Sequence, residues 1–314
     1  MSILSIDFGG TRTRAAWYTA DYAQLARSEM RSHVEQSMEQ VIERIIELGR
    51  KVVPQGATVR AIGITAPGPL DTRAGVIRHA KTLPGWRDVP LCKLLSEAFG
   101  GAPAFIENDA NLAALAEYHR GAARGCDPAL YLTISTGIGG GLVSHGQLFA
   151  GWSGLAIEPG HMRFTLPDGT VKRWEELASG VALGWTAERY LAASDQPSSL
   201  RALAEVDGQA VGEAGQAGDR LALSVIEETG RWLGLGLTNL LHLFSPQVIV
   251  LGGSVSKLGE LILGPARATI HEHILDEQFI PPDLLRAAYY GEDVCLIGAA
   301  LHAGSRIAGG NRED

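Results

Sequence analysis

The sequence lacks the features that several classes of protein require. No run of about 18 apolar residues occurs in its 314 residues, so nothing predicts a membrane span. Its 27 lysines and arginines are outnumbered by 35 acidic residues, and a net charge of −8 disfavours DNA or RNA as a partner. Three scattered cysteines and an N-terminus without signal-peptide features favour a reducing compartment. We therefore expect a cytoplasmic protein without a membrane or nucleic-acid partner.

The chain does hold enough apolar residues for more than one core, since 46% of it is hydrophobic. Its length then predicts two domains. Apolar runs that end in glycine or proline alternate with apolar residues at helical spacing, which is typical of an α/β fold. The predicted strands are 3–8, 13–18, 59–65, 104–106, 130–134 and 248–251, and the predicted helices lie near 41–48, 91–99, 112–116, 221–244 and 295–307.

Two of these strands end in a glycine turn and continue into a further strand. Asp7-Phe8-Gly9-Gly10-Thr11 follows the first strand, and Ser135-Thr136-Gly137-Ile138-Gly139-Gly140-Gly141 follows the strand at 130–134. Glycine lets the backbone approach a ligand, and successive N–H groups in such a turn bind phosphate oxygens. The pair predicts two halves of one polyphosphate site, with Thr11 and Thr136 as hydroxyl donors and Asp7 as a carboxylate for magnesium.

Each glycine turn taken alone is also compatible with an ordinary hairpin. Neither turn is a Walker A loop, because no Gly-Lys-Ser/Thr follows, and neither has the Gly-x-Gly-x-x-Gly spacing that opens a Rossmann helix. A phosphate-binding hairpin that occurs once in each half describes both turns better. It indicates a weak internal repeat of strand, glycine turn and strand.

Polar residues after a third strand are candidates for chemistry. Asn108 and Asp109 lie between a short strand and a helix, where α/β proteins place reactive groups. Asp109 is either the N-cap of that helix or a carboxylate that accepts a proton, and the two roles are compatible.

Three further groups allow more than one interpretation. Glu158 and His161 flank a Pro-Gly turn and are candidates for hydrogen bonds to a polyol, or else belong to a surface turn. Glu175 and Glu176 stand at a predicted helix start, where acidic residues complement the helix dipole. Gly252-Gly253-Ser254 is either a tight turn or a surface for a nucleotide base or ribose.

In this order and spacing, the motifs resemble those of the ROK family of sugar kinases and repressors, in the actin-like ATPase superfamily. The resemblance covers nearly the whole chain. It implies an α/β fold of two actin-like, ribonuclease H-like lobes with a ligand cleft between them. The small lobe would comprise residues 1–119 plus 295–314, and the large lobe residues 120–294. The resemblance rests on the glycine turns and on Pro67-Gly68-Pro69, Leu83-Pro84-Gly85-Trp86, Glu107-Asn108-Asp109-Ala110-Asn111, Glu158-x-Gly160-His161, Ser179-Gly180, Gly252-Gly253-Ser254 and Leu296-Ile297-Gly298-Ala299-Ala300.

The resemblance also implies a role for individual residues. Asp109 matches the general base that takes the proton from the sugar hydroxyl, and Asp7 matches the carboxylate that faces magnesium through water. The implied sugar-binding residues are Gly68, Asn108, Glu158, His161 and Glu175. The implied nucleotide-binding residues are Asp7, Gly9, Gly10, Thr11, Thr136 and Gly137 around the phosphates, with Gly252 and Gly253 at the adenosine.

The chain departs from the family in the segment that usually holds a structural zinc. The family carries cysteines there, after the Gly-His pair, whereas residues 162–174 contain none. Only His161 of the four usual ligands remains, and one ligand cannot hold a tetrahedral zinc site. We predict no structural zinc, and we expect Trp174 and Phe164 to order the segment by packing.

Two smaller departures concern the ligands. Ala80-Lys81-Thr82 stands where the family commonly has Ala-Pro-Asn, so a shorter hydroxyl replaces an amide and the sugar preference is expected to differ. Arg12 stands where lysine is frequent and presents a planar fork instead. The repressor branch has a helix-turn-helix before the first glycine turn, which begins here at residue 7, so we expect a kinase.

The sequence thus predicts a glucokinase-like, ATP-dependent hexose kinase that phosphorylates a primary hydroxyl at C6, with ATP and Mg²⁺ as cofactors. The resemblance implies a homodimer. Three alternatives stay open: an N-acetylhexosamine or fructose kinase of the same family, a polyphosphate-dependent glucokinase, and a catalytically silent sugar sensor. Relatives that use polyphosphate tend to lose glycines from the second turn, whereas Gly139-Gly140-Gly141 is complete here.

Overall fold

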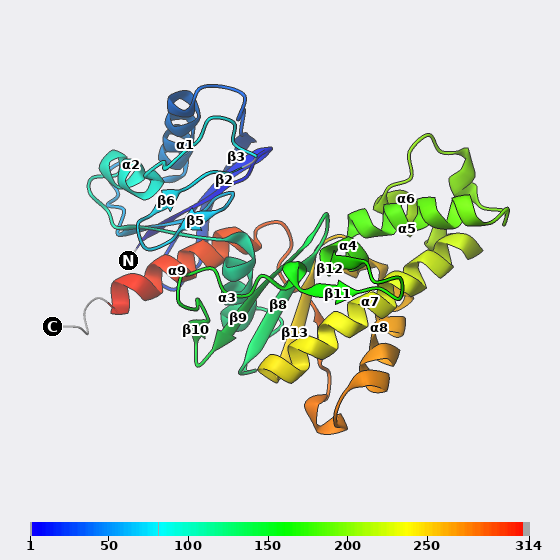
Figure 1. Ribbon diagram of the computed structural model, residues 1–314. Helices are drawn as coiled ribbons and strands as arrows, with labels where there is room; N and C mark the ends of the chain where they lie inside the picture. Colours follow the sequence, from blue (N-terminus) through cyan, green and yellow to red (C-terminus); the bar gives the residue numbers. More distant parts are fainter. Residues whose placement is uncertain (1, 81, 310–314) are drawn as a thin grey trace. The chain divides into compact units, whose positions relative to one another are not determined.

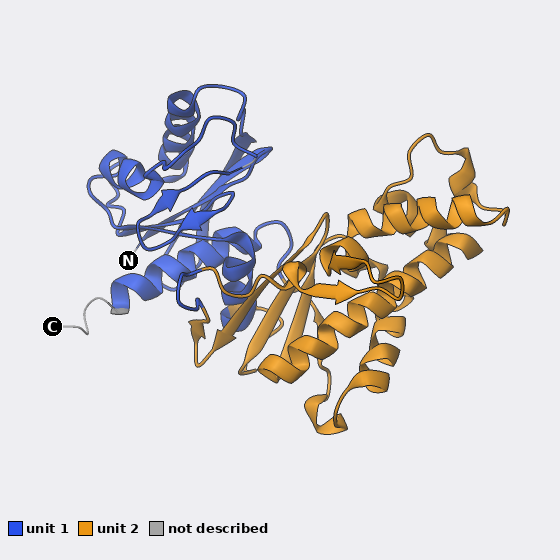
Figure 2. Ribbon diagram, viewed as in Figure 1, with its two compact units in different colours: residues 1–119, 150–154, 290–314 blue, residues 120–149, 155–289 orange. Residues whose placement is uncertain are grey.

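The computed structural model describes residues 2–80 and 82–309, which form two compact units (Figure 2). The first unit comprises residues 1–119, 150–154 and 290–314, and the second comprises residues 120–149 and 155–289. Each unit is described by itself below. The chain thus crosses from one unit to the other more than once, and its C-terminal helix belongs to the same unit as its first strand.

A five-stranded sheet forms the centre of the first unit, in the order β3-β2-β1-β4-β7. The first three strands run antiparallel to one another, whereas β4 and β7 run parallel to β1. Their bounds are β1 Ile3–Phe8, β2 Arg12–Tyr18, β3 Gln24–Arg31, β4 Ala61–Thr65 and β7 Ala104–Glu107, and a separate ribbon is formed by β5 Leu70–Asp71 and β6 Val76–Ile77.

The second unit contains a sheet of the same design, in the order β10-β9-β8-β13-β14. Again two antiparallel pairs lie on one side of the central strand and two parallel pairs on the other. The internal repeat predicted from the sequence is therefore confirmed at the level of architecture. The strands are β8 Ala129–Ile134, β9 Ile138–Ser144, β10 Gln147–Leu148, β13 Val248–Gly252 and β14 Leu285–Ala287.

Helices cover both faces of the first sheet (Figure 1). Alternate residues of β1 point to opposite faces, so Leu4 and Ile6 join a core with α1 and α2, while Ile3 joins a core with α9. Helix α9 lies against β4 so closely that a Cβ on Gly63 would overlap the carbonyl group of Ala299. The helices are α1 Met38–Val52, α2 Leu91–Ala98, α3 Asp109–Arg120 and α9 Val294–Gly309.

The core of the second unit forms around α7, which runs from Arg220 to Phe244. Asp219 starts this helix by accepting hydrogen bonds from two of its first N–H groups. None of the described helices, α7 included, is long and apolar enough to cross a membrane. The other elements are α4 Glu175–Ala178, α5 Gly180–Ala193, α6 Gly208–Gln216, α8 Glu260–His273, the hairpin of β11 Arg163–Thr165 and β12 Val171–Arg173, and the 3₁₀ turns η1 Pro159–His161, η2 Ser199–Ala202, η3 Val255–Leu258 and η4 Glu277–Phe279.

Trp174 is the most deeply buried side chain of the segment 162–174. It has no exposed surface, and its indole N–H donates to the Trp232 carbonyl at 2.8 Å. Burial of a whole tryptophan side chain contributes roughly 5 kcal/mol as an upper estimate. Phe164 packs edge-on against the Trp232 ring, with ring centroids 6.1 Å apart. The two aromatic residues expected to order the segment both pack against α7.

The predicted strands and helices are present, with ends that shift by a few residues, but several elements were missed. Strand β3 lies at the sheet edge with polar, half-exposed residues, so it gives little hydrophobic signal. Helix α8 contains Gly264 and Pro265, which are usual helix breakers, and α5 begins at Gly180. Tertiary packing against α7 outweighs these local preferences.

Candidate active site

The first glycine turn closes the β1–β2 hairpin, where Phe8 pairs with Thr13. The Gly9 N–H donates to the Arg12 carbonyl at 2.9 Å within the turn. Ser32 braces the turn from the end of β3, because its hydroxyl donates to the Gly9 carbonyl at 2.6 Å and its N–H to the Thr11 carbonyl at 2.9 Å. The predicted hairpin is confirmed, and the Thr11 side chain is exposed at its tip.

Asp7 lies at the carboxyl edge of the three parallel strands, in one row with Thr65 and Glu107. Directly across the hairpin is Arg14, whose Nη1 donates to Asp7 Oδ2 at 3.0 Å. Burial raises the pKa of Asp7 to about 6, although the Arg14 charge opposes the shift. Arg14 also donates to the Glu292 carbonyl at 2.9 Å, so it is fixed independently of Asp7.

The Asn108-Asp109 pair stands at the same edge, where β7 passes into α3. The structure corrects the N-cap interpretation of Asp109. The capping side chain is Asn108, whose Oδ1 accepts the Asn111 N–H at 2.7 Å, and Asp109 is already the first helical residue. Capping by Asn108 leaves the Asp109 side chain exposed, with one oxygen accepting the Ala110 N–H at 2.8 Å.

The buried Glu107 holds this strand-to-helix junction from behind. Its Oε1 accepts the Asn108 N–H at 2.9 Å and the Asn111 amide N–H at 3.1 Å. Burial raises the pKa of Glu107, and these two hydrogen bonds act in the opposite direction. The junction that carries the predicted base is thus fixed by side chains on both sides of it.

Two other predicted positions of this unit lie in loops. Gly68 is exposed in the loop after β4. Thr82 lies beside the first glycine turn, because a Cβ built on Gly10 would be 3.8 Å from the Thr82 Cβ. Lys81 lies outside the described residues, and Arg12 forms an exposed ion pair with Glu292 at 3.6 Å.

In the second unit, the glycine turn of the β8–β9 hairpin is the centre of the candidate site. The Ser135 N–H donates to the Gly137 carbonyl at 2.9 Å, and the Gly180 N–H donates to the Ser135 carbonyl at 2.6 Å. The second bond joins the turn to the start of α5. The Gly180 N–H is thereby paired within the protein, so the contact holds the turn in place beside α5. Thr136 is exposed at the tip.

The Pro-Gly-His turn and Glu175 pack onto the same glycine turn. A Cβ on Gly137 would lie 2.7 Å from Glu175 Oε2, and one on Gly160 would lie 3.3 Å from the same oxygen. The neighbouring Glu158 and His161 are both exposed. Second-unit residues predicted to bind sugar and phosphate are therefore brought together, although no pattern along the chain links them.

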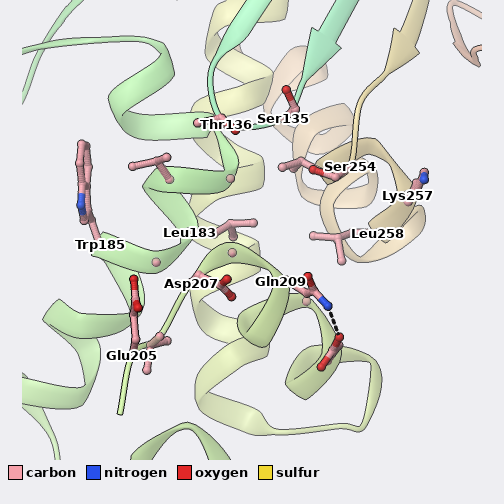
Figure 3. A pocket seen from close by; sticks show the side chains of 18 of the residues that line it. Ser135, Thr136, Leu183, Trp185, Glu205, Asp207, Gln209, Ser254, Lys257 and Leu258 are labelled. Atoms are coloured by element: carbon pink, nitrogen blue, oxygen red, sulfur yellow. Dashed lines mark hydrogen bonds between the residues drawn. The ribbon is translucent and has the colours of Figure 1, made fainter. Parts of the chain in front are cut away.

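Gly252 ends β13, Gly253 follows it, and both lie against β8. Gly253 has a φ of 90°, and a Cβ there would overlap the backbone of Ile134, so only glycine fits. Next to them is a cavity of about 550 Å³ that extends from Ser135 and Thr136 along the start of α5 (Figure 3). Figure 3 shows Trp185 on one side of this cavity and Ser254 and Leu258 on the other.

The cavity is acidic. Its lining includes four carboxylates and one lysine, Lys257. Within it, the Gln209 amide donates to Glu213 at 2.8 Å (Figure 3). Carboxylates accept hydrogen bonds from hydroxyl and amino groups and repel polyanions. The carboxylates are Glu188, Glu205, Asp207 and Glu213.

Sequence reasoning gave no role to Arg14, Arg173 or the cavity residue Trp185, and it quoted Glu107 only as part of a motif. The contact of Arg14 could have been predicted, because pairing Phe8 with Thr13 across the predicted turn also pairs Asp7 with Arg14. Glu107 and Arg173 bond to near neighbours whose positions depend on where α3 and α4 begin, and Trp185 reaches the cavity through packing between distant segments.

Asp7 is a suitable ligand for magnesium, because magnesium usually binds one or two carboxylates together with substrate phosphates and waters. Asp7 would supply the carboxylate at the edge that also carries the first glycine turn. Across residues 2–80 and 82–309, no group of three or more His, Cys, Asp or Glu side chains is arranged to hold a metal by itself. The absence of a structural zinc stays a prediction.

Comparison with known proteins identifies the family. Residues 3–305 match the profile of the ROK family, to which the chain belongs. A glucokinase from Thermotoga maritima is 31% identical, over 98% of this chain and 99% of the relative. This full-length similarity supports a sugar kinase enzyme.

Solved structures agree on the fold. A ROK hexokinase from Thermus thermophilus matches with a TM-score of 0.82 and 35% identity, over 98% of this chain and 100% of that one. A ROK family glucokinase from Streptomyces griseus, in complex with glucose and AMPPNP, matches with a TM-score of 0.76 and 30% identity over 97% and 100%. The mixed α/β fold with two sheet-based lobes is therefore that of the ROK sugar kinases, as predicted.

The raised pKa of Asp7 predicts a pH-dependent stability. The folded state holds the Asp7 proton more tightly than the unfolded chain, so this contribution is fully present below about pH 4 and is lost as the pH rises through about 6. Relative to Asp7→Asn, the wild type should lose roughly 1 kcal/mol of unfolding free energy between pH 5 and pH 7. Urea unfolding of the wild type and Asp7→Asn at both pH values, without Mg²⁺, measures this loss. If the difference in unfolding free energy between the two proteins were the same at pH 5 and pH 7, the raised pKa of Asp7 would be contradicted.

Proposed function

We propose that this protein transfers the γ-phosphoryl group of ATP to the primary hydroxyl of a hexose, with glucose at C6 as the first expectation. The observation that carries the proposal is the exposed Asp109 carboxylate, fixed at the sheet edge that also presents Asp7 and the first glycine turn. A carboxylate so placed suits a general base, because it is held in position and open to a substrate.

The second unit supports a nucleoside triphosphate as the donor. Its glycine turn is of the kind that binds phosphate, and Ser135 and Thr136 of that turn line one end of the cavity. The rest of the cavity carries four carboxylates, which suit the hydroxyl and amino groups of a nucleoside and disfavour a long polyanion. The complex of the Streptomyces griseus relative with AMPPNP and glucose is consistent with this donor and acceptor.

The chemistry follows from these positions. Phosphoryl transfer passes through a loose transition state, so positioning and charge stabilisation supply most of the catalysis. Thr11, Thr136 and the turn N–H groups would hold the phosphates, and Asp109 would orient the sugar hydroxyl and accept its proton as the new O–P bond forms. Mg²⁺, held by Asp7 through water, would neutralise phosphate charge when bound.

The remaining expectations rest on the resemblance. Asn108, Glu158, His161 and Glu175 are proposed to bind the sugar hydroxyls, and Gly68 to belong to the loop that closes on the sugar. A homodimer and a cytoplasmic location are proposed with them. An N-acetylhexosamine, fructose or another hexose stays open as the substrate.

One prediction concerns Asp109, the proposed general base. Asp109→Asn should lower kcat by about 10²- to 10⁴-fold and leave sugar binding intact, because the amide keeps the shape but cannot accept the proton. ADP release with MgATP against a panel of hexoses and N-acetylhexosamines measures turnover, and thermal shift measures sugar binding. Asp195→Asn, in an exposed loop, is the matched control. Near-wild-type turnover in Asp109→Asn would refute the assignment.

A second prediction concerns the sugar contacts. Glu158→Gln and His161→Ala should each raise the sugar KM by roughly 10-fold while the ATP KM changes little, because losing a hydrogen bond to the sugar costs about 1 to 1.5 kcal/mol. Initial rates with each substrate varied in turn separate the two constants. An unchanged sugar KM in both variants would exclude the polyol-binding interpretation.

A third prediction concerns the donor. ATP should exceed inorganic tripolyphosphate by at least about 100-fold in kcat/KM, because tripolyphosphate has the same phosphates without the nucleoside that the acidic cavity accommodates. Long-chain polyphosphate should be equally poor. Sugar phosphate formation with each donor provides the measurement, and a preference for polyphosphate would overturn the proposed donor.

A further inference from the structure

The end of strand β12 is joined to α7 by close packing of the Trp174 ring. Gly236 of α7 leaves a notch for the Trp174 ring, and a Cβ at that position would overlap the ring atoms. The Trp174 indole N–H donates to the Trp232 carbonyl at 2.8 Å, and the Trp174 N–H donates to the Met162 carbonyl at 2.8 Å. The ring therefore fixes the point where the chain enters α4.

Arg173 lies one residue before this anchor and holds both glutamates of α4. Its Nη1 forms an ion pair with Glu175 Oε1 at 2.5 Å, and its Nε donates to Glu176 Oε2 at 3.1 Å. The Arg173 backbone N–H donates to the same Glu176 oxygen at 2.8 Å. A planar guanidinium with several donors can make such paired contacts, whereas a lysine ammonium is a single point charge.

The second carboxylate oxygen of Glu175 points the other way. Glu175 Oε2 lies where a Cβ on Gly137 would be 2.7 Å away and a Cβ on Gly160 would be 3.3 Å away. The side chain thus reaches from Arg173 to the glycine turn of β8–β9 and to the Pro-Gly-His turn. Arg173 holds one oxygen, so the rotation of the carboxylate is fixed while the other oxygen faces the two turns.

We infer that Arg173 is a positioning residue for Glu175, and that Trp174, packed in the Gly236 notch, is the anchor that supports it. The inference rests on the proposed sugar-kinase function, in which Glu175 accepts hydrogen bonds from the sugar. Arg173 neutralises two adjacent glutamates and orients the one that faces the site. Residues 162–174, which lack cysteine, are ordered by this side-chain packing.

Steady-state kinetics test the positioning role. Arg173→Gln should raise the sugar KM by about 10- to 100-fold, the effect of losing a charged hydrogen bond, and leave the ATP KM within about 3-fold. Arg173→Lys should recover part of this loss, which a purely structural role would not predict. Arg163→Gln is the matched control, since exposed Arg163 pairs with Arg173 across the same hairpin. An unchanged sugar KM in Arg173→Gln would overturn the inference.

Hydrogen exchange tests the anchor without any need for turnover. The Leu177 and Ala178 N–H groups both donate to the Trp174 carbonyl at 2.9 Å, so their exchange reports the anchor. Gly236→Ala and Arg173→Gln should speed exchange in the peptide 174–179 by about 10-fold or more, which corresponds to roughly 1.4 kcal/mol of local opening. Gly264→Ala, whose added Cβ would meet open space on α8, should not.

The outcomes separate this inference from the proposed function. Unchanged hydrogen exchange in the peptide 174–179 of folded Gly236→Ala would overturn the role of Trp174 as an anchor. Unchanged exchange in Arg173→Gln would overturn the role of Arg173 in holding the two glutamates of α4. If Gly236→Ala fails to fold, as judged by circular dichroism, Arg173→Gln still decides the positioning role of Arg173, because Arg173 is one-third exposed and its removal leaves the core intact. Absence of turnover in the wild type would refute the proposed function, whereas the exchange experiment would still show whether Arg173 holds the glutamates of α4.

Discussion

Close approach of other segments to the backbone at glycine is the constraint on which this structure depends. Gly63 allows α9 to lie on β4, Gly253 allows the turn after β13 to lie on β8, and Gly236 admits the Trp174 ring. A methyl group at any of these positions would overlap backbone or ring atoms, and a packed interior cannot absorb that volume cheaply. Each contact lies within one unit and sets where a strand end or helix start stands, which in turn places the residues of the candidate site.

In both units a carboxylate of the candidate site is fixed by an arginine that is itself held by other groups. In the first unit Arg14 bonds to Asp7 and to Glu292, and in the second Arg173 bonds to both glutamates at the start of α4. A carboxylate held in this way keeps one oxygen in place and leaves the other for a ligand. Such pairs contribute more to positioning than to stability, because the cost of desolvating the charges offsets much of their attraction.

Local patterns were sufficient to find the hairpins and the strand-to-helix junction. The two glycine turns, the alternation of β1 and the Asn108-Asp109 pair all lie within short windows of sequence. The capping role was assigned to the wrong neighbour, since Asn108 rather than Asp109 caps α3. Adjacent capping residues compete for the same N–H groups, and the exact start of the helix decides between them.

The sequence alone determined the repeated strand, glycine turn and strand, the ROK resemblance and the absence of cysteine from residues 162–174, because these are properties of neighbouring residues. Only the tertiary structure decided that Trp174 packs on Gly236, that Arg173 orients Glu175, and that four carboxylates line one cavity. The reason is physical. These arrangements join segments from different elements through side-chain volume and charge, and no periodicity along the chain records which distant residues will come to lie together.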